Sequence, residues 1–552
     1  MPSNNNKRFS KSFIIIAMLL VLVAGGLIFW NVYKYKLIKG KAKDAVFESS
    51  HGLYTLHYDK INVDEAAGFL YVTNLTITPD TAMYRKMIAD KTNPPLLMRL
   101  AIPELRITGV KTPQAALSKK IEGRRVEINN ADVSFYFAKG HPDTAKEKQE
   151  MYQQILGSLK LIQVDTVDIV KASLSFIDIR NDKKMIEAAG ISILLRDVLV
   201  DSLHSNDDNR FFFAKQVHVK ADNGIVRNKQ GSYVYRFNGI NFSSVEKAFT
   251  VSEIKIEPLL NEAAIAKFSK VQKDRFNFTF NGIALKNINL PQLMQSSVIA
   301  DELLIKQSSF KIYRDLSYPR DKKERIGTFP HQLLMDMPVS VSVRKIILDN
   351  AFIEYKEKNA KSNYSGKVQF DHASATIDNV TNMDAEVKRN KNCVLNFNAS
   401  FLDMAAVRAR INMLLGDPHG KFSVNGSLDG FDASNLNVLL EPMALARIDK
   451  GRIKKLDFDL ACYDHGSDGK LTMLYDDLKV SLLKKDSTDN TLQKKDLASF
   501  VANLLVKNAN PLRKQDIRVA DIHYQRDTQR SFFNLIWKSI FTGAKESVGI
   551  KK

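Results

Sequence analysis

Apolar and polar residues alternate along most of this chain from about residue 45 onward. The clearest stretches are RFNFTFN at 275–281, VSVSVR at 339–344 and LNFNASF at 395–401. Successive side chains of a β-strand point to opposite faces of the sheet, so each stretch predicts an antiparallel strand with one apolar and one polar face. Similar segments recur between Asn, Asp and Gly turn residues. The pattern predicts an all-β protein.

Two motifs repeat at a similar spacing. The tetrapeptide FNGI occurs at 237–240 and at 280–283, 43 residues apart. The second motif joins two alternating segments through a polar and a small residue, and the small residues of its four copies are Ala131, Ala172, Ser308 and Ala351. A period of about 42 residues falls in the range of stacked or radial repeats, and the signatures of propeller blades are absent. We therefore expect an elongated, repetitive stack of strands; four unrelated strand-turn-strand units are the alternative.

Helices are predicted at few places. The stretch 143–162 has a capping aspartate and one apolar stripe, and the stretch 496–511 has a second stripe that stops before a proline. Both are expected to be packing elements. At Asp476 and Asp477 the apolar positions change from odd to even numbers. Adjacent residues of a strand point to opposite faces, so a bulge or a turn is favoured there over a pair of catalytic carboxylates.

The N-terminus carries an apolar run, FIIIAMLLVLVAGGLIFW at 13–30, of 18 consecutive uncharged residues. As a helix it spans about 27 Å, enough to cross the hydrocarbon core of a bilayer. A cleaved signal peptide is the alternative, but the run continues past the small-residue site at 23–25 and so favours an uncleaved anchor. Five lysines follow the span and oppose the positive-inside rule. Long domains translocate largely regardless of such charges, so we expect the bulk of the chain outside the cytoplasm.

Composition narrows the class of protein. A chain of 552 residues indicates several domains or a repetitive architecture. Its net charge of +20, from 81 Lys and Arg against 61 Asp and Glu, suits an acidic partner, either nucleic acid or an anionic membrane. The lysines are spread along the length and no nucleic-acid-binding motif is present, so no nucleic acid is expected. Two cysteines, Cys393 and Cys462, are too few for a disulfide scaffold or a cysteine metal cluster.

No residue pattern points to catalysis. The ten histidines show no pair at a metal-binding spacing, and the nucleophile elbow, the Walker loop and the dinucleotide fingerprint are all missing from the sequence. We therefore expect no enzyme activity, no catalytic residue, no metal and no cofactor. An enzyme acting on glycans or lipids would need a polar constellation that the sequence does not reveal.

Two stretches resemble a known family. Residues 420–486 resemble the C-terminal region of AsmA-like proteins, with strand, glycine turn, a segment of the type SNLNVLLEP, and then further strands. The matching residues are Gly426, Asn437, Pro442, Gly451, Phe458, Gly469, Tyr475, Asp477 and Leu478. The N-terminal anchor followed by residues 54–80 is similar to the start of the same family. The resemblance covers motifs near both ends of the chain, whereas the middle shares only the general pattern of strands and turns. It carries over no catalytic residue.

The resemblance implies a Gram-negative envelope protein held in the inner membrane, with its β-rich body in the periplasm. The family belongs with TamB-like and bridge-like lipid-transfer proteins, in which a curved sheet forms a groove with an apolar lining. Expected partners are phospholipids or other envelope lipids, the inner membrane and, as a further candidate, the outer membrane, whose assembly the protein would assist. The alternative is a structural or adhesive envelope protein with a closed β core and no lipid cargo.

Candidate residues follow from the pattern. The groove lining is predicted from the three alternating stretches, and its candidates are Phe276, Phe278, Phe280, Val339, Val341, Val343, Leu395 and Phe397. Near the C-terminus, a helix over 530–548 would place Phe533, Trp537, Ile540, Phe541, Ala544 and Val548 on one side, with Arg530, Lys538 and Lys545 beside or opposite them. Aromatic residues flanked by cations are typical of a helix that lies in a membrane interface. The alternative is a helix that closes the last open strand edge of the sheet.

The predicted organisation has five parts. They are a cytoplasmic N-terminus at 1–12, a transmembrane anchor at 13–33, a repetitive β-rich periplasmic body at 45–410, an AsmA-like C-terminal region at 411–528 and an amphipathic C-terminal helix at 529–552.

Overall fold

The protein is described by a computed structural model that covers residues 42–94, 96–110, 119–138, 151–156, 159–204, 207–485, 492–494 and 506–550. Strands account for 58% of the structure and helices for 15%, so the predicted β-rich character is confirmed. The predicted anchor at 13–33 lies outside the described residues. Within the described ranges, no helix is both long and apolar enough to cross a membrane.

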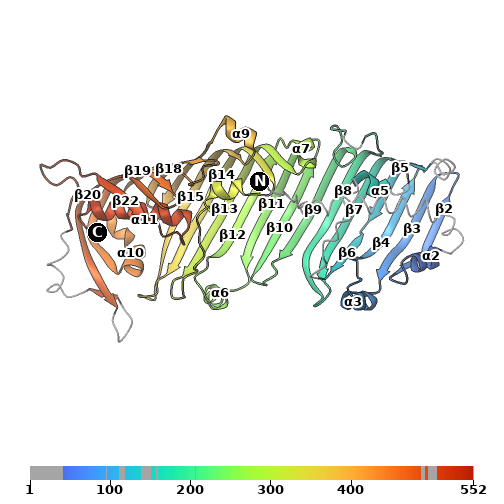
Figure 1. Cartoon of the computed structure of the whole chain (residues 1–552), viewed down its shortest axis with the longest axis horizontal. Coiled ribbons are helices and arrows are strands. Elements are labelled where there is room, and N and C mark those ends of the chain that lie inside the picture. Colours follow the sequence, from blue (N-terminus) through green and yellow to red (C-terminus); the bar gives the residue numbers. More distant parts are fainter. Residues whose placement is uncertain are drawn as a thin grey trace. The chain divides into compact units, whose positions relative to one another are not determined.

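The chain forms two compact units (Figure 1). Unit 1 consists of Met1–Ile254 and Lys286–Ser297, and unit 2 of Lys255–Leu285 and Val298–Lys552. The division therefore falls inside the stretch that the sequence presents as a single β-rich body.

Unit 1 contains mostly long strands with a few short helices. Its elements are α2 (Ala42–Ser49), β1 (Tyr54–His57), β2 (Lys60–Asp64), β3 (Phe69–Pro79), α3 (Thr81–Ala89), β4 (Leu97–Thr108), β5 (Lys120–Asn129), β6 (Asp132–Phe137), α5 (Met151–Leu156), β7 (Leu161–Asp178), β8 (Lys183–Val200), β9 (Ala214–Arg227), β10 (Tyr233–Ser243), the start of β11 (Ala248–Pro258) and α7 (Leu290–Met294). The pairs β5–β7 and β6–β7 are parallel, whereas β7–β8, β8–β9 and β9–β10 are antiparallel. The apolar side chains of β3 to β9 form one large buried core.

Unit 2 contains the remaining strands. Its elements are α6 (Glu262–Ser269), β12 (Arg275–Lys286), β13 (Ser297–Asp315), α8 (Pro330–Met335), β14 (Ser340–Lys358), β15 (Ser365–Thr381), α9 (Asp384–Arg389), β16 (Asn392–Phe401), β17 (Ala405–Leu414), β18 (Phe422–Asp432), η1 (Ala433–Leu436), α10 (Asn437–Ala444), β19 (Ala446–Tyr463), β20 (Gly466–Lys485), β21 (Leu492–Lys494), β22 (Ala520–Gln525) and α11 (Phe532–Ser547). Strands β14 to β20 pair antiparallel in chain order, and β22 pairs with β20.

One face of the unit 2 sheet is apolar from β14 to β20. Directly paired residues point to the same side, and the pairs Ile377–Leu395, Leu395–Ile411 and Val424–Leu460 carry apolar side chains across successive strands. We call this side the apolar face. The alternation that the sequence shows at 395–401 therefore extends across the sheet.

Strands β13 and β14 run in the same direction. Asp301 lies 3.6 Å from Arg344 and Asp315 lies 3.7 Å from Lys358, and each pair is 43 residues apart in sequence. Parallel neighbours need a crossover connection. Residues 316–339, which include α8, provide it, and we call this segment the crossover.

The repeated small-residue motif is a β-bulge. The residue before each small residue has a left-handed backbone, with φ of 55° at Asn130, 54° at Lys171, 45° at Gln307 and 55° at Asn350. The small residues that follow are all buried, at 5% exposure or less. The glycines of the two FNGI copies, Gly239 and Gly282, also have positive φ, of 63° and 54°. The repeated feature is therefore a bulge and not a turn between two strands. Strands β7, β13 and β14 each continue through the motif, and the bulge bends the strand there.

Three further local predictions can be compared with the structure. The parity change at Asp476 and Asp477 is a confirmed irregularity inside β20, where Asp477 has φ of 51° and the two carboxylates pair with Lys454 and Lys450. The helix predicted at 143–162 is described only as α5, which agrees with a packing element because Ile155 and Leu156 are buried. Most of the helix predicted at 496–511 lies outside the described residues, and 506–511 is not helical.

Candidate functional site

Four phenylalanines gather on neighbouring strands β12 and β13 of unit 2. The ring centroids of Phe278 and Phe310 lie 5.5 Å apart, and those of Phe280 and Phe310 lie 5.2 Å apart. Phe276 contacts Phe278 at 5.4 Å. We call Phe276, Phe278, Phe280 and Phe310 the aromatic cluster. The sequence placed the first three on one face, and these contacts bear that out.

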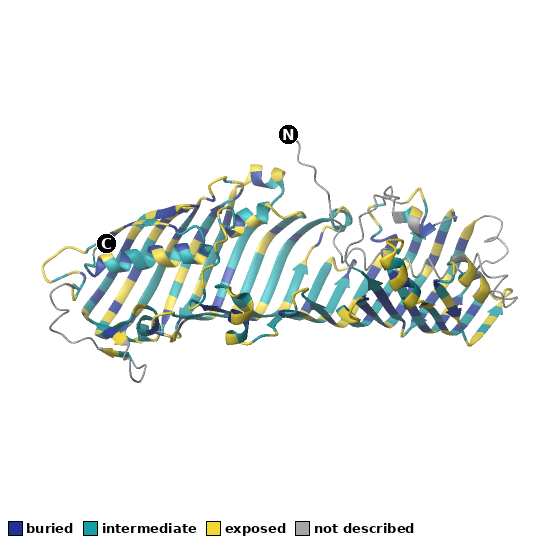
Figure 2. Cartoon of the chain, turned by 60° about the horizontal axis from the view of Figure 1, so that its bottom comes forward, coloured by how far each residue is buried: buried dark blue, intermediate teal, exposed yellow. Residues whose placement is uncertain are grey.

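The aromatic cluster is accessible. None of the twelve residues of β12 is buried, although this strand carries three phenylalanines, and Phe276 remains 37% exposed. The buried core clusters of the described residues include none of the other three, Phe278, Phe280 and Phe310. In Figure 2 the strands at the place of β12 in Figure 1 are mainly teal, the colour of intermediate burial. The described residues therefore bury these aromatic side chains only in part.

Polar side chains lie at the end of the aromatic cluster that is nearest the start of β12. Arg314 donates two hydrogen bonds to Asp274, of 2.7 and 2.6 Å, and only 9% of its side chain is exposed. On β14, the Tyr355 hydroxyl donates to Glu357 at 2.7 Å, and burial followed by the nearby Glu357 charge raises the Tyr355 pKa. Because Arg314 is neutralised by a bidentate partner, this end is polar but has little net positive charge.

The predicted valines lie elsewhere. Val339 precedes β14, Val341 is half-buried and Val343 is 5% exposed. The 43-residue offset between β13 and β14 places Val343 beside Ala300, about 33 Å along the strand from Phe310. The aromatic cluster and these valines therefore do not form one surface, contrary to the sequence-based expectation of a shared lining.

Leu395 and Phe397 lie at the margin of the unit 2 core. Both are half-buried on β16; Leu395 packs against that core, and the Phe397 ring lies 5.8 Å from Phe370. Phe370 in turn contacts Phe401, which is 6% exposed. These two candidates thus mark the transition from exposed aromatic residues to a buried core.

The C-terminal helix covers part of the sheet. Helix α11 spans Phe532–Ser547, close to the prediction, and lies against β20 and β22 (Figure 1). Its buried stripe consists of Phe532, Leu535, Ser539, Gly543 and Ser547. Ser539 shares a 2.6 Å hydrogen bond with Ser467, and a Cβ at Gly543 would lie 2.8 Å from Leu471. The helix therefore packs on a face of the sheet. This differs from the alternative of a helix that closes the last open strand edge.

The predicted membrane-facing stripe of α11 is divided. Phe533 is 70% exposed and Trp537 is 39% exposed, whereas Val548 is buried and Ile540 and Ala544 pack against the core. The Trp537 and Phe541 rings stack at 6.4 Å. Lys538 and Lys545 lie 5.7 and 5.3 Å from the centre of the Phe541 ring. We call Phe533, Trp537, Phe541, Lys538 and Lys545 the outer patch of α11.

The crossover completes the cover over the C-terminal strands. Phe329 is fully buried, with ring centroids 5.4 Å from both Phe422 and Phe532, and the Arg526 guanidinium lies 4.4 Å from its ring. The backbone N–H of Arg325 donates to Thr528 at 2.9 Å. The segment between β13 and β14 is therefore anchored beside α11, far along the sheet from the strands that it connects.

The residues that carry the family resemblance have structural roles. The Asn437 side chain bonds both the N–H and the carbonyl of Ile448, at 2.7 and 2.8 Å. Tyr475 is fully buried, and its hydroxyl donates to the carbonyls of Lys507 and Ser547. At Gly469 a side chain would collide with the carbonyl of Asp459. These three matching positions thus hold strands and a helix together.

Cysteine and metal chemistry are not evident in the described ranges. Cys393 on β16 and Cys462 on β19 are buried free thiols, and burial raises their pKa to about 11 and about 12. No group of three His, Cys, Asp or Glu residues suited to a metal ion occurs among the residues that the structure describes.

Sequence reasoning missed Phe310. The signal was present, since Phe310 lies in the motif copy at 303–315, but assigning its face requires knowing that the bulge at Gln307 shifts the alternation by one residue.

A scan against protein-family models gave no match, and neither did a search of curated proteins. The resemblance to AsmA-like proteins therefore remains a prediction from the sequence motifs.

Proposed function

We propose that unit 2 shields the acyl chains of phospholipids or other envelope lipids along the aromatic cluster of β12 and β13. The observation that carries the proposal is the incomplete burial of β12, a strand with three phenylalanines and no buried residue. Exposed apolar patches of this kind mark sites for ligands or partners. An acyl chain is a suitable occupant because its contacts are non-directional and require no polar partner.

The membrane setting belongs to the same proposal. The apolar run at 13–30 would hold the chain in an inner membrane, with the β-rich body in the periplasm. The outer patch of α11 would contact an anionic bilayer, since its aromatic residues suit the interface and its two lysines suit acidic headgroups. The resemblance to AsmA-like proteins supports a role in lipid transfer and outer-membrane assembly.

Lipid retention tests the proposal. The full chain would be purified in detergent, exchanged into lipid-free amphipol, and its copurifying lipids measured by mass spectrometry. Phe278→Asp should lower the lipid-to-protein ratio about tenfold, because a carboxylate within the aromatic cluster makes contact with an acyl chain unfavourable. Thr279→Asp is the matched control: it adds the same charge at the next residue, on the other face of β12. Equal lipid content in both variants and the parent would exclude the aromatic cluster as the lipid site.

Membrane contact has its own test. Flotation of the chain with vesicles containing anionic lipid should fall when Phe533 and Trp537 are both replaced by Ser, and should weaken with salt in the parent. Thr542→Ser, on the same helix, should leave flotation unchanged.

A second function, a structural or adhesive envelope protein without lipid cargo, is favoured by a separate observation. Unit 1 has a large buried core, and the C-terminal strands of unit 2 are covered by α11 and the crossover. If no lipid is retained by the full chain, this second function becomes the better account.

A further inference from the structure

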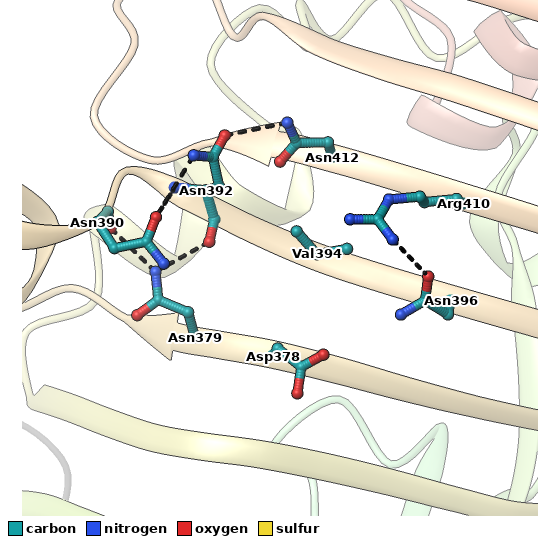
Figure 3. Close-up of a pocket in the computed structure, with 8 residues that line it drawn as sticks. All are labelled: Asp378, Asn379, Asn390, Asn392, Val394, Asn396, Arg410 and Asn412. Carbon is teal, nitrogen blue, oxygen red and sulfur yellow. Dashed lines mark hydrogen bonds between the residues drawn. The ribbon is translucent and has the colours of Figure 1, made fainter.

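A polar hollow of about 450 Å³ lies on unit 2, over β15, β16 and β17 (Figure 3). Its lining consists of Asp378, Asn379, Asn390, Asn392, Val394, Asn396, Arg410 and Asn412. The volume is within the range of about 300–1,000 Å³ that is common for small-molecule sites.

The hollow faces away from the apolar face. Asp378 pairs with Val394, and Val394 pairs with Asn412, so these three point to one side. The neighbouring pairs Ile377–Leu395 and Leu395–Ile411 point to the opposite side, into the unit 2 core. The hollow also lies on other strands than the aromatic cluster of β12 and β13, so the two sites share no residue.

Local backbone geometry opens the hollow. Asn379 has a left-handed backbone with φ of 62°, and its side-chain amide donates to the carbonyls of Asn390 and Asn392, each at 2.9 Å. These bonds hold the end of β15 to the start of β16 and to Asn390, the C-cap residue of α9. The strand end is fixed without filling the space above Val394, as the sticks in Figure 3 show.

The lining keeps much of its hydrogen-bonding capacity. Asn412 donates a hydrogen bond of 3.0 Å to Asn392. The hydrogen bonds that Asn392 donates to Asn390 and that Arg410 donates to Asn396 are longer, each 3.4 Å. The Asn412 carbonyl oxygen is buried and accepts no hydrogen bond from a described residue. Bonds of 3.4 Å lie beyond the usual range and are weak, so a ligand could replace them.

The residue types select the ligand class. Each of the five amides both donates and accepts, as the hydroxyls of a sugar do, and Asp378 and Arg410 add one acceptor group and one donor fork. The carboxylate opposes an anion such as phosphate, and the polar lining opposes a hydrocarbon. We infer that this hollow binds a neutral saccharide unit, either free or as part of a larger glycan, and we call it the saccharide site.

Binding can be measured on the full chain in detergent by saturation-transfer NMR. The probes would be glucose, N-acetylglucosamine and a glucose tetrasaccharide, with inorganic phosphate as the anionic comparison. Saturable transfer from at least one sugar, with a Kd of about 10 mM or below, is expected. A tetrasaccharide that binds more tightly than either monosaccharide would indicate a glycan as the source, and equal affinities a free sugar.

Matched substitutions on β17 and β16 locate the binding. Arg410→Gln and Asn396→Val should each weaken sugar binding about tenfold, since each removes a lining group. Arg408→Gln is the control, because Arg408 precedes Arg410 by two residues on the same face of β17 but pairs with Asp429 outside the hollow. Thermal melting confirms that each variant is folded. No sugar signal in a folded parent, an equal loss in Arg408→Gln, or Arg410-dependent binding of phosphate alone would each overturn the inference.

Discussion

Two regions of unit 2 have the same alternation of apolar and polar residues and differ in how they are buried. In β20 and β22, Leu471, Tyr475 and Ile522 are fully buried beneath α11. In β12 and β13 the phenylalanines of the aromatic cluster remain half-exposed or exposed. The difference comes from the cover, since α11 and the crossover lie over the C-terminal strands. Alternation thus predicts which face is apolar but not what that face contacts.

A charge beneath α11 should give the largest effect. Leu535 is fully buried, so Leu535→Asp removes its apolar contacts and places a carboxylate against the sheet. We expect destabilisation of about 4 kcal/mol or more, enough to release the helix. Urea denaturation followed by circular dichroism measures it. A change below about 1 kcal/mol would mean that α11 does not form the cover described here.

Close packing of α11 should give the next largest effect. Gly543 approaches β20 and β22 so closely that a Cβ would lie 2.8 Å from Leu471 and 2.9 Å from Ile522. Gly543→Val should therefore lower the free energy of unfolding by about 2–3 kcal/mol through overpacking. Thr542→Val, at a half-buried position outside the buried stripe of the same helix, should change it by less than about 0.5 kcal/mol. Similar values for the two variants would contradict the close contact.

The aromatic cluster should tolerate the same charge. Because Phe278 lies on a strand with no buried residue, Phe278→Asp leaves its carboxylate within reach of water. We expect a loss of at most about 1.5 kcal/mol in the same urea experiment, well below the loss for Leu535→Asp. A loss comparable to that of Leu535→Asp would show that this region is a closed core.

The covered region should also respond to pH. His331 of α8 is 2% exposed, and burial lowers its pKa despite the opposing influence of Asp464 and Asp417. The unfolded state then takes up a proton more readily, so stability is highest above about pH 6.5 and falls as pH decreases toward the folded-state pKa. Thermal midpoints on both sides of that range should differ less in His331→Phe than in the parent. Equal differences in the parent and in His331→Phe would contradict this role of His331.

Sequence alone predicted part of the candidate site. The alternation at 275–281 correctly grouped Phe276, Phe278 and Phe280, because strand side chains alternate with a period of two whatever the tertiary context. It could not supply Phe310, nor show that Val343 lies far along the sheet, because strand pairing and register depend on contacts between residues distant in sequence. The saccharide site was also missed, since its asparagines resemble ordinary turn and surface residues until three strands bring them together.

Local sequence patterns were sufficient to predict the β-rich class, the apolar face, the irregularity at Asp477 and a C-terminal helix, whose observed ends lie within about two residues of the predicted range 530–548. Each of these depends on local periodicity and on residues near one another in the chain. The tertiary structure alone decided which stripe of α11 is buried. Two apolar stripes were available on this helix, and the small residues Ser539, Gly543 and Ser547 allow the closer approach to the sheet, which leaves Phe533 and Trp537 outside. It also decided that β13 and β14 are parallel, with a crossover that reaches the far strands of the sheet, where Phe329 is buried against Phe422 and Phe532.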